Sequence, residues 1–182
     1  MSQTGLIQYN PEKEVEWVLK LCLIGSSQLK TTLSRRVADN KFDVNYMPTL
    51  GVDIKTKRIT VDNQRIKLIL MDTASQELFG ENLGRTYYEG ASACIIFFEK
   101  HDDDSFSAVP DWIKDFRSVS DCPIVLVGII TDAPEQVSYA SARKYALYWG
   151  LEFYAIKSSD TLFFEDILIN AVKLYFQKIS SS

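Results

Sequence analysis

Apolar residues along the chain fall into short continuous runs that alternate with segments of helical spacing. The runs over residues 16–24, 93–98 and 123–129 are typical of strands buried on both faces of a sheet. Residues 52–61 alternate imperfectly between polar and apolar, and a further strand follows over 66–71 after Asp62-Asn63, so these segments predict an antiparallel hairpin. A shorter strand is expected over 152–156.

Helical spacing marks the segments between these strands. Residues 30–40 carry Leu33 and Val37 four positions apart, which places both on one helix face. Ser105 is expected to cap a helix. One face of that helix would carry Phe106, Val109, Ile113 and Phe116. Two further helices are predicted over 138–149 and 161–178.

The resulting order, β-α-β-β followed by further α-β pairs, predicts an α/β fold. We expect a six-stranded, mostly parallel sheet with one antiparallel strand and helices on both faces. Gly25, Asp72 and Asp132 each follow or end a predicted strand, and ligands of such sheets bind at the C-terminal strand ends. We expect one domain over 18–178, an N-terminal arm over 1–17 and a tail over 179–182.

Composition narrows the function classes. The chain has 182 residues, a net charge of −4 and 46% hydrophobic residues, which indicates a globular protein without a nucleic-acid bias. Three cysteines without metal-type spacing suggest reduced thiols in a cytoplasmic protein. His101 is the single histidine, which disfavours a histidine-based triad or zinc site. We find neither a spanning segment nor a lipidation motif, and expect a monomer.

A phosphate-binding turn is predicted where the first strand ends. Gly25 is followed by small polar residues and then by Lys30-Thr31 at the expected start of a helix. Backbone N–H groups and the helix dipole converge at such a turn, Lys30 could reach a phosphate, and the Thr31 hydroxyl could bind Mg²⁺. The turn is one residue shorter than the usual phosphate-loop formula, and Leu29 stands where a second glycine is expected.

Three segments together resemble the Ras superfamily of small GTPases, and most closely its Rab-like branch. Residues 45–53 (NYMPTLGVD) are similar to a switch I segment, residues 72–77 (DTASQE) to the switch II motif, and residues 87–91 (YYEGA) to the family's YYRGA. The resemblance covers residues 18–178. It implies a phosphate-loop G domain that binds GTP or GDP with Mg²⁺.

The resemblance implies a role for each matching residue. Lys30 would neutralise phosphate charge, Gln76 would orient the attacking water, and Asp132 would select guanine. Metal ligation would involve Thr31, Thr49 and Asp72. The nucleotide would contact Gly25, Ser27, Gln28, Leu29, Lys30, Thr31, Thr32, Phe42, Tyr46, Thr49, Ser75, Asp132, Ser158 and Ser159. Effectors or regulators would bind residues 42–53, 52–71 and 72–88.

Departures from the family pattern suggest weakened binding. Besides the shortened turn, Ser75 replaces a glycine, and Ile129-Ile130 replaces the Asn-Lys pair of the guanine motif. Lys157-Ser158-Ser159 replaces Ser-Ala-Lys. Each lost hydrogen bond would cost on the order of 1–3 kcal/mol.

Structural readings of the same residues stay open. Thr31 could be an ordinary first-turn residue, Lys30 a solvated one, Asp72 a strand-end cap, and Phe42 and Tyr46 packed loop aromatics. Three functions follow: a switch of weakened nucleotide affinity that hydrolyses GTP slowly, a pseudo-GTPase scaffold, and a site retasked for another phosphorylated ligand or for nucleoside triphosphates in general.

Overall fold

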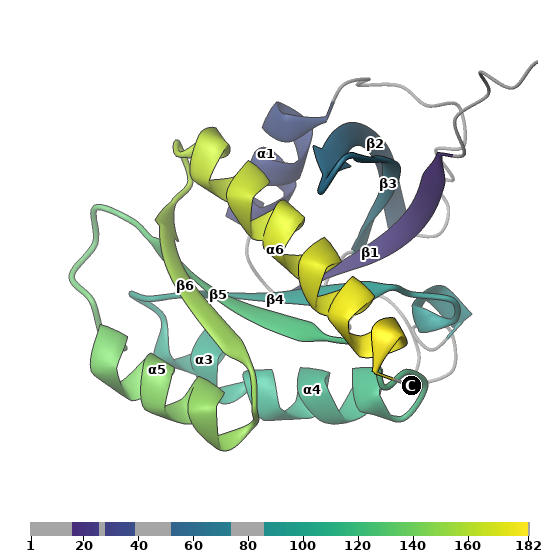
Figure 1. Cartoon of the computed structure of the whole chain (residues 1–182). Helices are drawn as coiled ribbons and strands as arrows, with labels where there is room; N and C mark the ends of the chain where they lie inside the picture. The colour runs from purple at the N-terminus through teal and green to yellow at the C-terminus, as the bar shows by residue number, and fades with distance from the viewer. Residues whose placement is uncertain (1–15, 26–27, 39–51, 74–85, 182) are drawn as a thin grey trace, which may run out of the picture.

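The computed structural model describes residues 16–25, 28–38, 52–73 and 86–181, and Figure 1 shows their arrangement. The strands are β1 (Trp17–Gly25), β2 (Val52–Val61), β3 (Gln64–Thr73), β4 (Ala93–Glu99), β5 (Ile124–Ile130) and β6 (Glu152–Lys157). The helices are α1 (Gln28–Val37), α3 (Asp103–Ser107), α4 (Val109–Arg117), α5 (Tyr139–Tyr148) and α6 (Thr161–Ser180).

The strands form one six-stranded sheet in the order β2-β3-β1-β4-β5-β6. β2 and β3 pair antiparallel, and the other pairs are parallel. Asp62 and Asn63 at the hairpin turn have φ of 47° and 62°, the left-handed conformation that short polar residues tolerate best. The predicted α/β fold, its hairpin and its single antiparallel strand are therefore confirmed.

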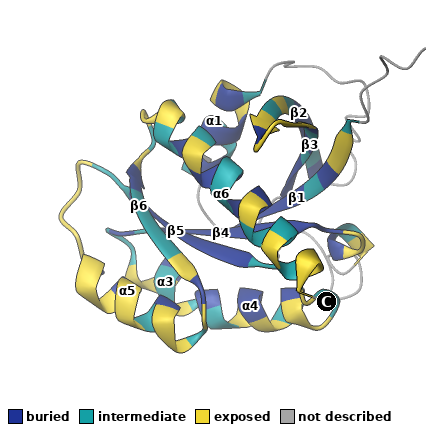
Figure 2. Cartoon of the chain, in the orientation of Figure 1, coloured by how far each residue is buried: buried dark blue, intermediate teal, exposed yellow. Residues whose placement is uncertain are grey.

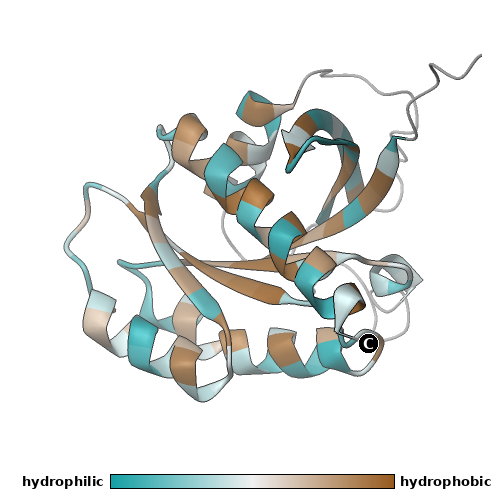
Figure 3. Cartoon of the chain, viewed as in Figure 1, coloured by the Kyte–Doolittle hydropathy of each residue, from teal (hydrophilic) through white to brown (hydrophobic). Residues whose placement is uncertain are grey.

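Alternating residues of the central strands divide the core into two layers. Leu21, Leu23, Ile95 and Phe97 face a cluster completed by α1 and α6, whereas the neighbouring residues of the same strands face a cluster completed by α4 and α5. Both faces of β1, β4 and β5 are thus apolar, as Figures 2 and 3 show. This arrangement explains why these strands are continuous apolar runs rather than alternating ones.

The helix expected to begin at Ser105 is organised differently. Asp102 is the N-cap of α3, and its carboxylate accepts hydrogen bonds from the backbone N–H groups of Asp104 and Ser105. Ser105 is buried inside α3, where its hydroxyl donates to the Asp102 carbonyl at 2.8 Å and accepts from the Glu99 N–H at 2.9 Å. The predicted cap was therefore wrong, because an aspartate one turn earlier occupies that position.

The cysteines are free thiols. Cys22 and Cys94 are buried and Cys122 is half-buried, and burial raises the pKa of Cys22 to about 12. Among the described residues no helix is both long and apolar enough to span a membrane.

Candidate functional site

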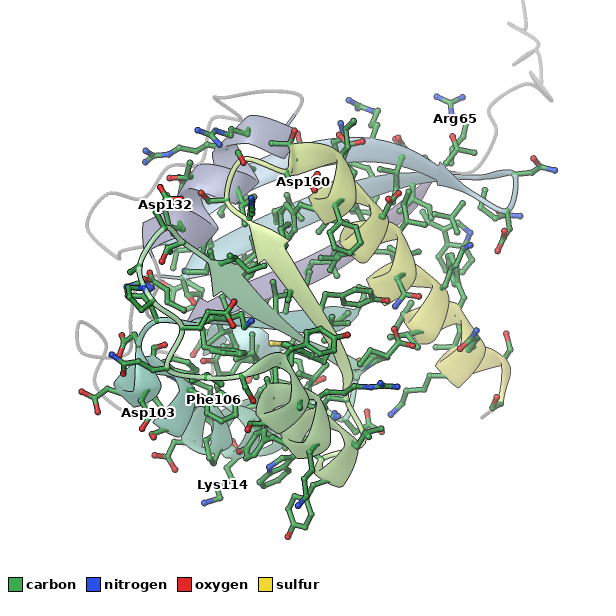
Figure 4. The ribbon with its side chains drawn as sticks, turned by 90° about the vertical axis from the view of Figure 1, so that its left-hand side faces the viewer. Arg65, Asp103, Phe106, Lys114, Asp132 and Asp160 are labelled. Atoms are coloured by element: carbon green, nitrogen blue, oxygen red, sulfur yellow. The ribbon has the colours of Figure 1, made fainter. Side chains whose placement is uncertain are left out.

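The polar residues singled out at the strand ends lie along one edge of the sheet. Gly25 ends β1, and Asp72 of β3 pairs in register with Leu23. Asp132 follows β5 by two residues. Figure 4 places Asp132 and Asp103 along this edge, far from Arg65 at the hairpin end. The structure thus brings together the C-terminal strand ends, the position where parallel sheets bind ligands.

Gly25 is required where it stands. Its φ is 132°, and a Cβ atom at this position would overlap the Phe97 carbonyl oxygen of the neighbouring strand. Only glycine combines this backbone conformation with so close an approach. Leu29, at the position where a second glycine was expected, is half-buried and packs against the core beneath α1.

Lys30 and Asp72 form a buried ion pair at the centre of this edge. The exposed fractions of the two residues are 2% and 3%. The Lys30 ammonium group contacts Asp72 Oδ1 and also donates to the Thr73 carbonyl at 2.5 Å. The pair joins α1 to β3 across 42 positions of sequence. A solvated role for Lys30 is therefore wrong in this structure.

The second carboxylate oxygen of Asp72 has partners of its own. Ser34 Oγ on α1 donates to Oδ2 at 3.2 Å. The ammonium group of Lys55 on β2 lies 3.6 Å from the same oxygen and 2.8 Å from Asp53 Oδ2. Lys55 is 3% exposed, and its Nζ has close charged neighbours without a well-aligned hydrogen bond.

Sequence reasoning missed Lys55. The antiparallel register places Asp53 opposite Asp72, and Lys55 follows Asp53 by two residues on the same strand face. The position of Lys55 near Asp72 could have been predicted, because the hairpin was expected and the turn of a hairpin fixes which residues lie opposite each other.

The pKa of Asp72 is lowered from its usual value of 3.8. Burial alone would raise this pKa, but the charges of Lys30 and Lys55 and the hydrogen bonds from Lys30 and Thr31 outweigh it. Asp72 is therefore held as a carboxylate at neutral pH.

These donors suit a hard divalent cation. Mg²⁺ prefers oxygen ligands and is usually held by one or two protein groups together with phosphate and water. The Asp72 carboxylate and the Thr31 hydroxyl beside it provide such oxygens. Within the described part of the chain no group of three or more His, Cys, Asp and Glu side chains could hold a metal ion alone.

The part of the edge predicted to bind the base is built differently. Asp132 is exposed, whereas Ile129 is buried in the core and Ile130 is half-buried. Thr131 Oγ1 lies 3.0 Å from His101 Nδ1. The two isoleucines thus extend the core to the end of β5, where the family motif has polar residues.

The turn over residues 157–160 lies beside α1. Arg36 of α1 donates to the Ser158 carbonyl at 2.8 Å, and the Asp160 carboxylate caps α6 by accepting from the Phe163 N–H. Ser158 is half-buried and Ser159 is exposed. This turn is therefore fixed between α1 and α6 at the same edge.

Several predicted site residues lie outside the described residues. These are Ser27, Phe42, Tyr46, Thr49, Ser75 and Gln76. Gln28 begins α1, and Thr31 and Thr32 are half-buried in its first turns. The described residues thus include Lys30, Thr31 and Asp72, which are predicted to contact phosphate or metal, and Asp132, which is predicted to select guanine.

Comparison with known proteins agrees with this geometry. The Ras family model matches residues 20–177. Human Ras-related protein Rab-3A is 30% identical over 176 residues, covering 94% of this chain and 80% of that protein. Rab-3 of Caenorhabditis elegans is 29% identical over 183 residues, covering 98% and 83%. Ras-related protein RAB1BV of Beta vulgaris is 29% identical over 175 residues, covering 93% and 81%. The chain belongs to the Ras family of small GTPases.

Proposed function

We propose that the protein is a regulatory switch that binds guanine nucleotides with Mg²⁺ at reduced affinity and hydrolyses GTP slowly. The buried Lys30–Asp72 pair carries this proposal. The lysine and the carboxylate that would bind phosphate and metal lie side by side at the C-terminal edge of the sheet. A buried charge pair of this kind costs desolvation energy, and nucleotide binding explains its presence.

Nucleotide binding would replace the Lys30–Asp72 contact by contacts to phosphate and metal. Lys30 would leave Asp72 for the β- and γ-phosphates, and the freed Asp72 oxygen, with Thr31 and Thr49, would hold the metal. Bound Mg²⁺ would neutralise charge on the phosphate oxygens. Because the Lys30–Asp72 contact must break first, part of the gain from nucleotide binding is lost. This exchange supports the reduced affinity.

The base half supports the same conclusion. Asp132 would accept hydrogen bonds from guanine N1 and N2, but Ile129 and Ile130 offer no polar group to the base or to the phosphate turn. Losing several hydrogen bonds of roughly 1 kcal/mol each lowers affinity by two or more orders of magnitude. Family proteins hold guanine nucleotides tightly, so micromolar binding would remain.

Hydrolysis would depend on Gln76, which would orient the attacking water. Effectors and regulators would bind residues 42–53, 52–71 and 72–88, and a partner would supply the additional transition-state charge. We propose a monomeric, cytoplasmic protein with its G domain over residues 18–178 between an arm (1–17) and a tail (179–182), without nucleic-acid binding.

The alternative function is a pseudo-GTPase scaffold. The observation that favours it is the charge balance of the site: Lys30, Lys55 and Ser34 together satisfy both oxygens of Asp72 without any nucleotide. A site that is already satisfied can hold one shape, which a scaffold requires. A third possibility is a site for another phosphorylated ligand or for nucleoside triphosphates generally.

The test is the nucleotide content of freshly purified protein, measured by denaturing it and separating the supernatant by ion exchange beside GDP, GTP and ATP. Stoichiometric guanine nucleotide supports the switch. For empty protein, unfolding is measured with GTP and Mg²⁺ at about a hundredfold excess over the expected Kd, where a binder gains ~2.7 kcal/mol. No gain would favour the scaffold, and equal gains with ATP would favour the third function.

Hydrolysis is tested separately. Wild-type protein should release phosphate from GTP faster than a Gln76→Leu variant that binds the same nucleotide equally well. Equal rates, with and without cell extract as a source of partners, would remove the catalytic part of the proposal and leave the binding part intact.

A further inference from the structure

The segment that carries Asp132 is attached to the segment that follows β4. We define the loop clamp as Lys100, His101 and Asp103 after β4 together with Thr131, Glu135, Gln136 and Val137 after β5. The Lys100 carbonyl accepts from the N–H groups of Gln136 and Val137, each at 2.9 Å. The Asp103 N–H donates to Gln136 Oε1 at 3.3 Å. Residues 131–136, which we call the base loop, are therefore fixed at their C-terminal end by hydrogen bonds to the segment that follows β4.

Lys100 strengthens this attachment with its side chain. Its Nζ donates to Glu135 Oε1 at 2.6 Å. The Lys100 side chain is 4% exposed and that of Glu135 is 45% exposed. The lysine stem lies over Gly128 of β5, where a Cβ atom would come within 3.2 Å of Lys100 Cγ. The buried stem and the charged bond at its end thus bridge the two segments.

His101 and Thr131 fix the near end of the base loop. His101 Nε2 lies 3.2 Å from Glu99 Oε2. Because an ionised carboxylate only accepts hydrogen bonds, Nε2 carries a proton, and Nδ1 of the neutral ring accepts from the Thr131 hydroxyl. A charged ring would instead donate from Nδ1 to the same oxygen. The His101–Thr131 bond therefore persists in both charge states.

Thr131 passes this constraint to Asp132. Thr131 Oγ1 also accepts from the Ala133 N–H at 3.3 Å, so the peptide group that follows Asp132 is bonded to the same hydroxyl that contacts His101. Asp132 is exposed, and among the described residues its carboxylate forms no ion pair or hydrogen bond. A fixed backbone with an unengaged carboxylate is suited to accept hydrogen bonds from a ligand.

We infer that His101 and Thr131 are positioning residues for guanine recognition, and that the loop clamp replaces the support that the family's motif asparagine gives to the base loop. The buried Ile129 cannot provide that support. This inference rests on the proposed guanine-nucleotide binding. It implies that base selectivity, rather than phosphate affinity, depends on two residues that do not contact the nucleotide.

The test compares GDP with IDP, which lacks the 2-amino group of guanine. The Kd values of both are measured by titration calorimetry in the presence of Mg²⁺, and their ratio cancels the shared phosphate contacts. Asp132→Ala sets the ratio expected without base recognition. Thr131→Val, which keeps the side-chain shape but removes the hydroxyl, should lower the IDP-to-GDP ratio roughly fivefold to tenfold.

Two further variants separate positioning from folding. Thr131→Ser retains the hydroxyl and should restore the wild-type ratio, and His101→Leu should lower the ratio as Thr131→Val does. A purely structural role would change the melting temperature in proportion to each substitution and leave the ratio constant. The inference is overturned if Thr131→Val and His101→Leu keep the wild-type ratio within about twofold while Asp132→Ala abolishes it. Failure of the wild-type protein to bind GDP would instead remove the proposed function itself.

Discussion

The two halves of the site that we propose to bind phosphate and base, called the phosphate half and the base half, lie on the same edge of one sheet but are stabilised by opposite means. In the phosphate half, Lys30 and Asp72 are 2% and 3% exposed and satisfy each other. In the base half, Asp132 is exposed and its position is maintained by neighbours such as Thr131 and His101. One half therefore holds its functional charges inside the fold, and the other presents its charge to solvent.

Because of this difference, substitutions in the two halves should have different effects on stability and on ligand binding. Removing a buried charge leaves its partner unpaired in a medium of low dielectric, so the fold itself loses stability. Removing an exposed group changes ligand recognition with little effect on folding. Substitution of a buried charge in the phosphate half should therefore change stability and binding together, whereas substitution of an exposed polar residue in the base half should change mainly selectivity.

The largest expected effect follows substitution of the glycine at the phosphate end. Gly25→Ala should unfold the protein or cost more than about 3 kcal/mol, because φ of 132° and the Phe97 carbonyl oxygen both exclude a side chain. Gly128→Ala at the base end meets only side-chain atoms, Phe98 Cζ at 2.9 Å foremost, and should cost roughly 1–3 kcal/mol. Urea denaturation measures both, and an equal loss would contradict the comparison.

Breaking the buried pair should have the next largest effect. Lys30→Met should lower the free energy of unfolding of nucleotide-free protein by about 3 kcal/mol, since Lys55 is then the one charged partner of Asp72 among the residues that the structure describes. The exposed Lys144 of α5 provides the matched control, and Lys144→Met should stay within about 0.5 kcal/mol of wild type. Unchanged stability in Lys30→Met would show that the pair serves the ligand alone.

The elements of the fold could be predicted because their signals are local. Continuous apolar runs defined β1, β4 and β5, and the turn at Asp62-Asn63 defined the hairpin. The start of α3 was misplaced because Asp102 and Ser105 are both good capping residues, and only tertiary packing decides between them. Ser105 lies in the core, where its hydroxyl accepts a hydrogen bond from the Glu99 N–H.

The site could be predicted only where single residues carry it. Asp72 and Asp132 were singled out at strand ends and Lys30 at the start of a helix, and the structure places them on one edge; their roles in binding stay predictions. Lys55 and His101 were missed as site residues because their roles come from pairing between segments: Lys55 through the β2–β3 register, and His101 through a contact with Thr131 across 30 positions. Sequence periodicity does not encode such contacts.

The pH dependence of stability should reveal the buried carboxylate of the phosphate half. The lowered pKa of Asp72 means that its carboxylate stabilises the fold above its ordinary value of 3.8, and that this contribution is lost as the pH falls below 3.8 through the folded-state pKa. Wild type should exceed Asp72→Asn by about 2 kcal/mol at about pH 7. The difference should shrink in acid below 3.8. Urea denaturation of the nucleotide-free proteins measures it, and a difference that grew with acidity would contradict the assignment.

The smallest effect is expected from Lys55, whose charge lies beside the carboxylate proposed to hold the metal. Lys55→Met replaces a buried cation by an apolar side chain of similar length and should lower stability by about 1 kcal/mol, less than Lys30→Met, because Asp72 keeps Lys30 and the Asp53 side chain is 30% exposed. Removing the charge 3.6 Å from Asp72 Oδ2 should nevertheless favour a divalent cation. The Mg²⁺ concentration that half-maximally slows GDP release should fall by about tenfold, which corresponds to about 1.4 kcal/mol.

Lys57→Met is the control for this measurement, because it removes the same charge from the same strand where the partner is Glu165 of α6, at 2.7 Å. It should leave the Mg²⁺ midpoint unchanged. Equal shifts in both variants would mean that Mg²⁺ responds only to overall charge, and the buried network around Asp72 would then not control the metal. A shift confined to Lys55→Met would mean that Lys55 of β2 controls how strongly the phosphate half depends on its metal. The sequence had not predicted Lys55 as a site residue.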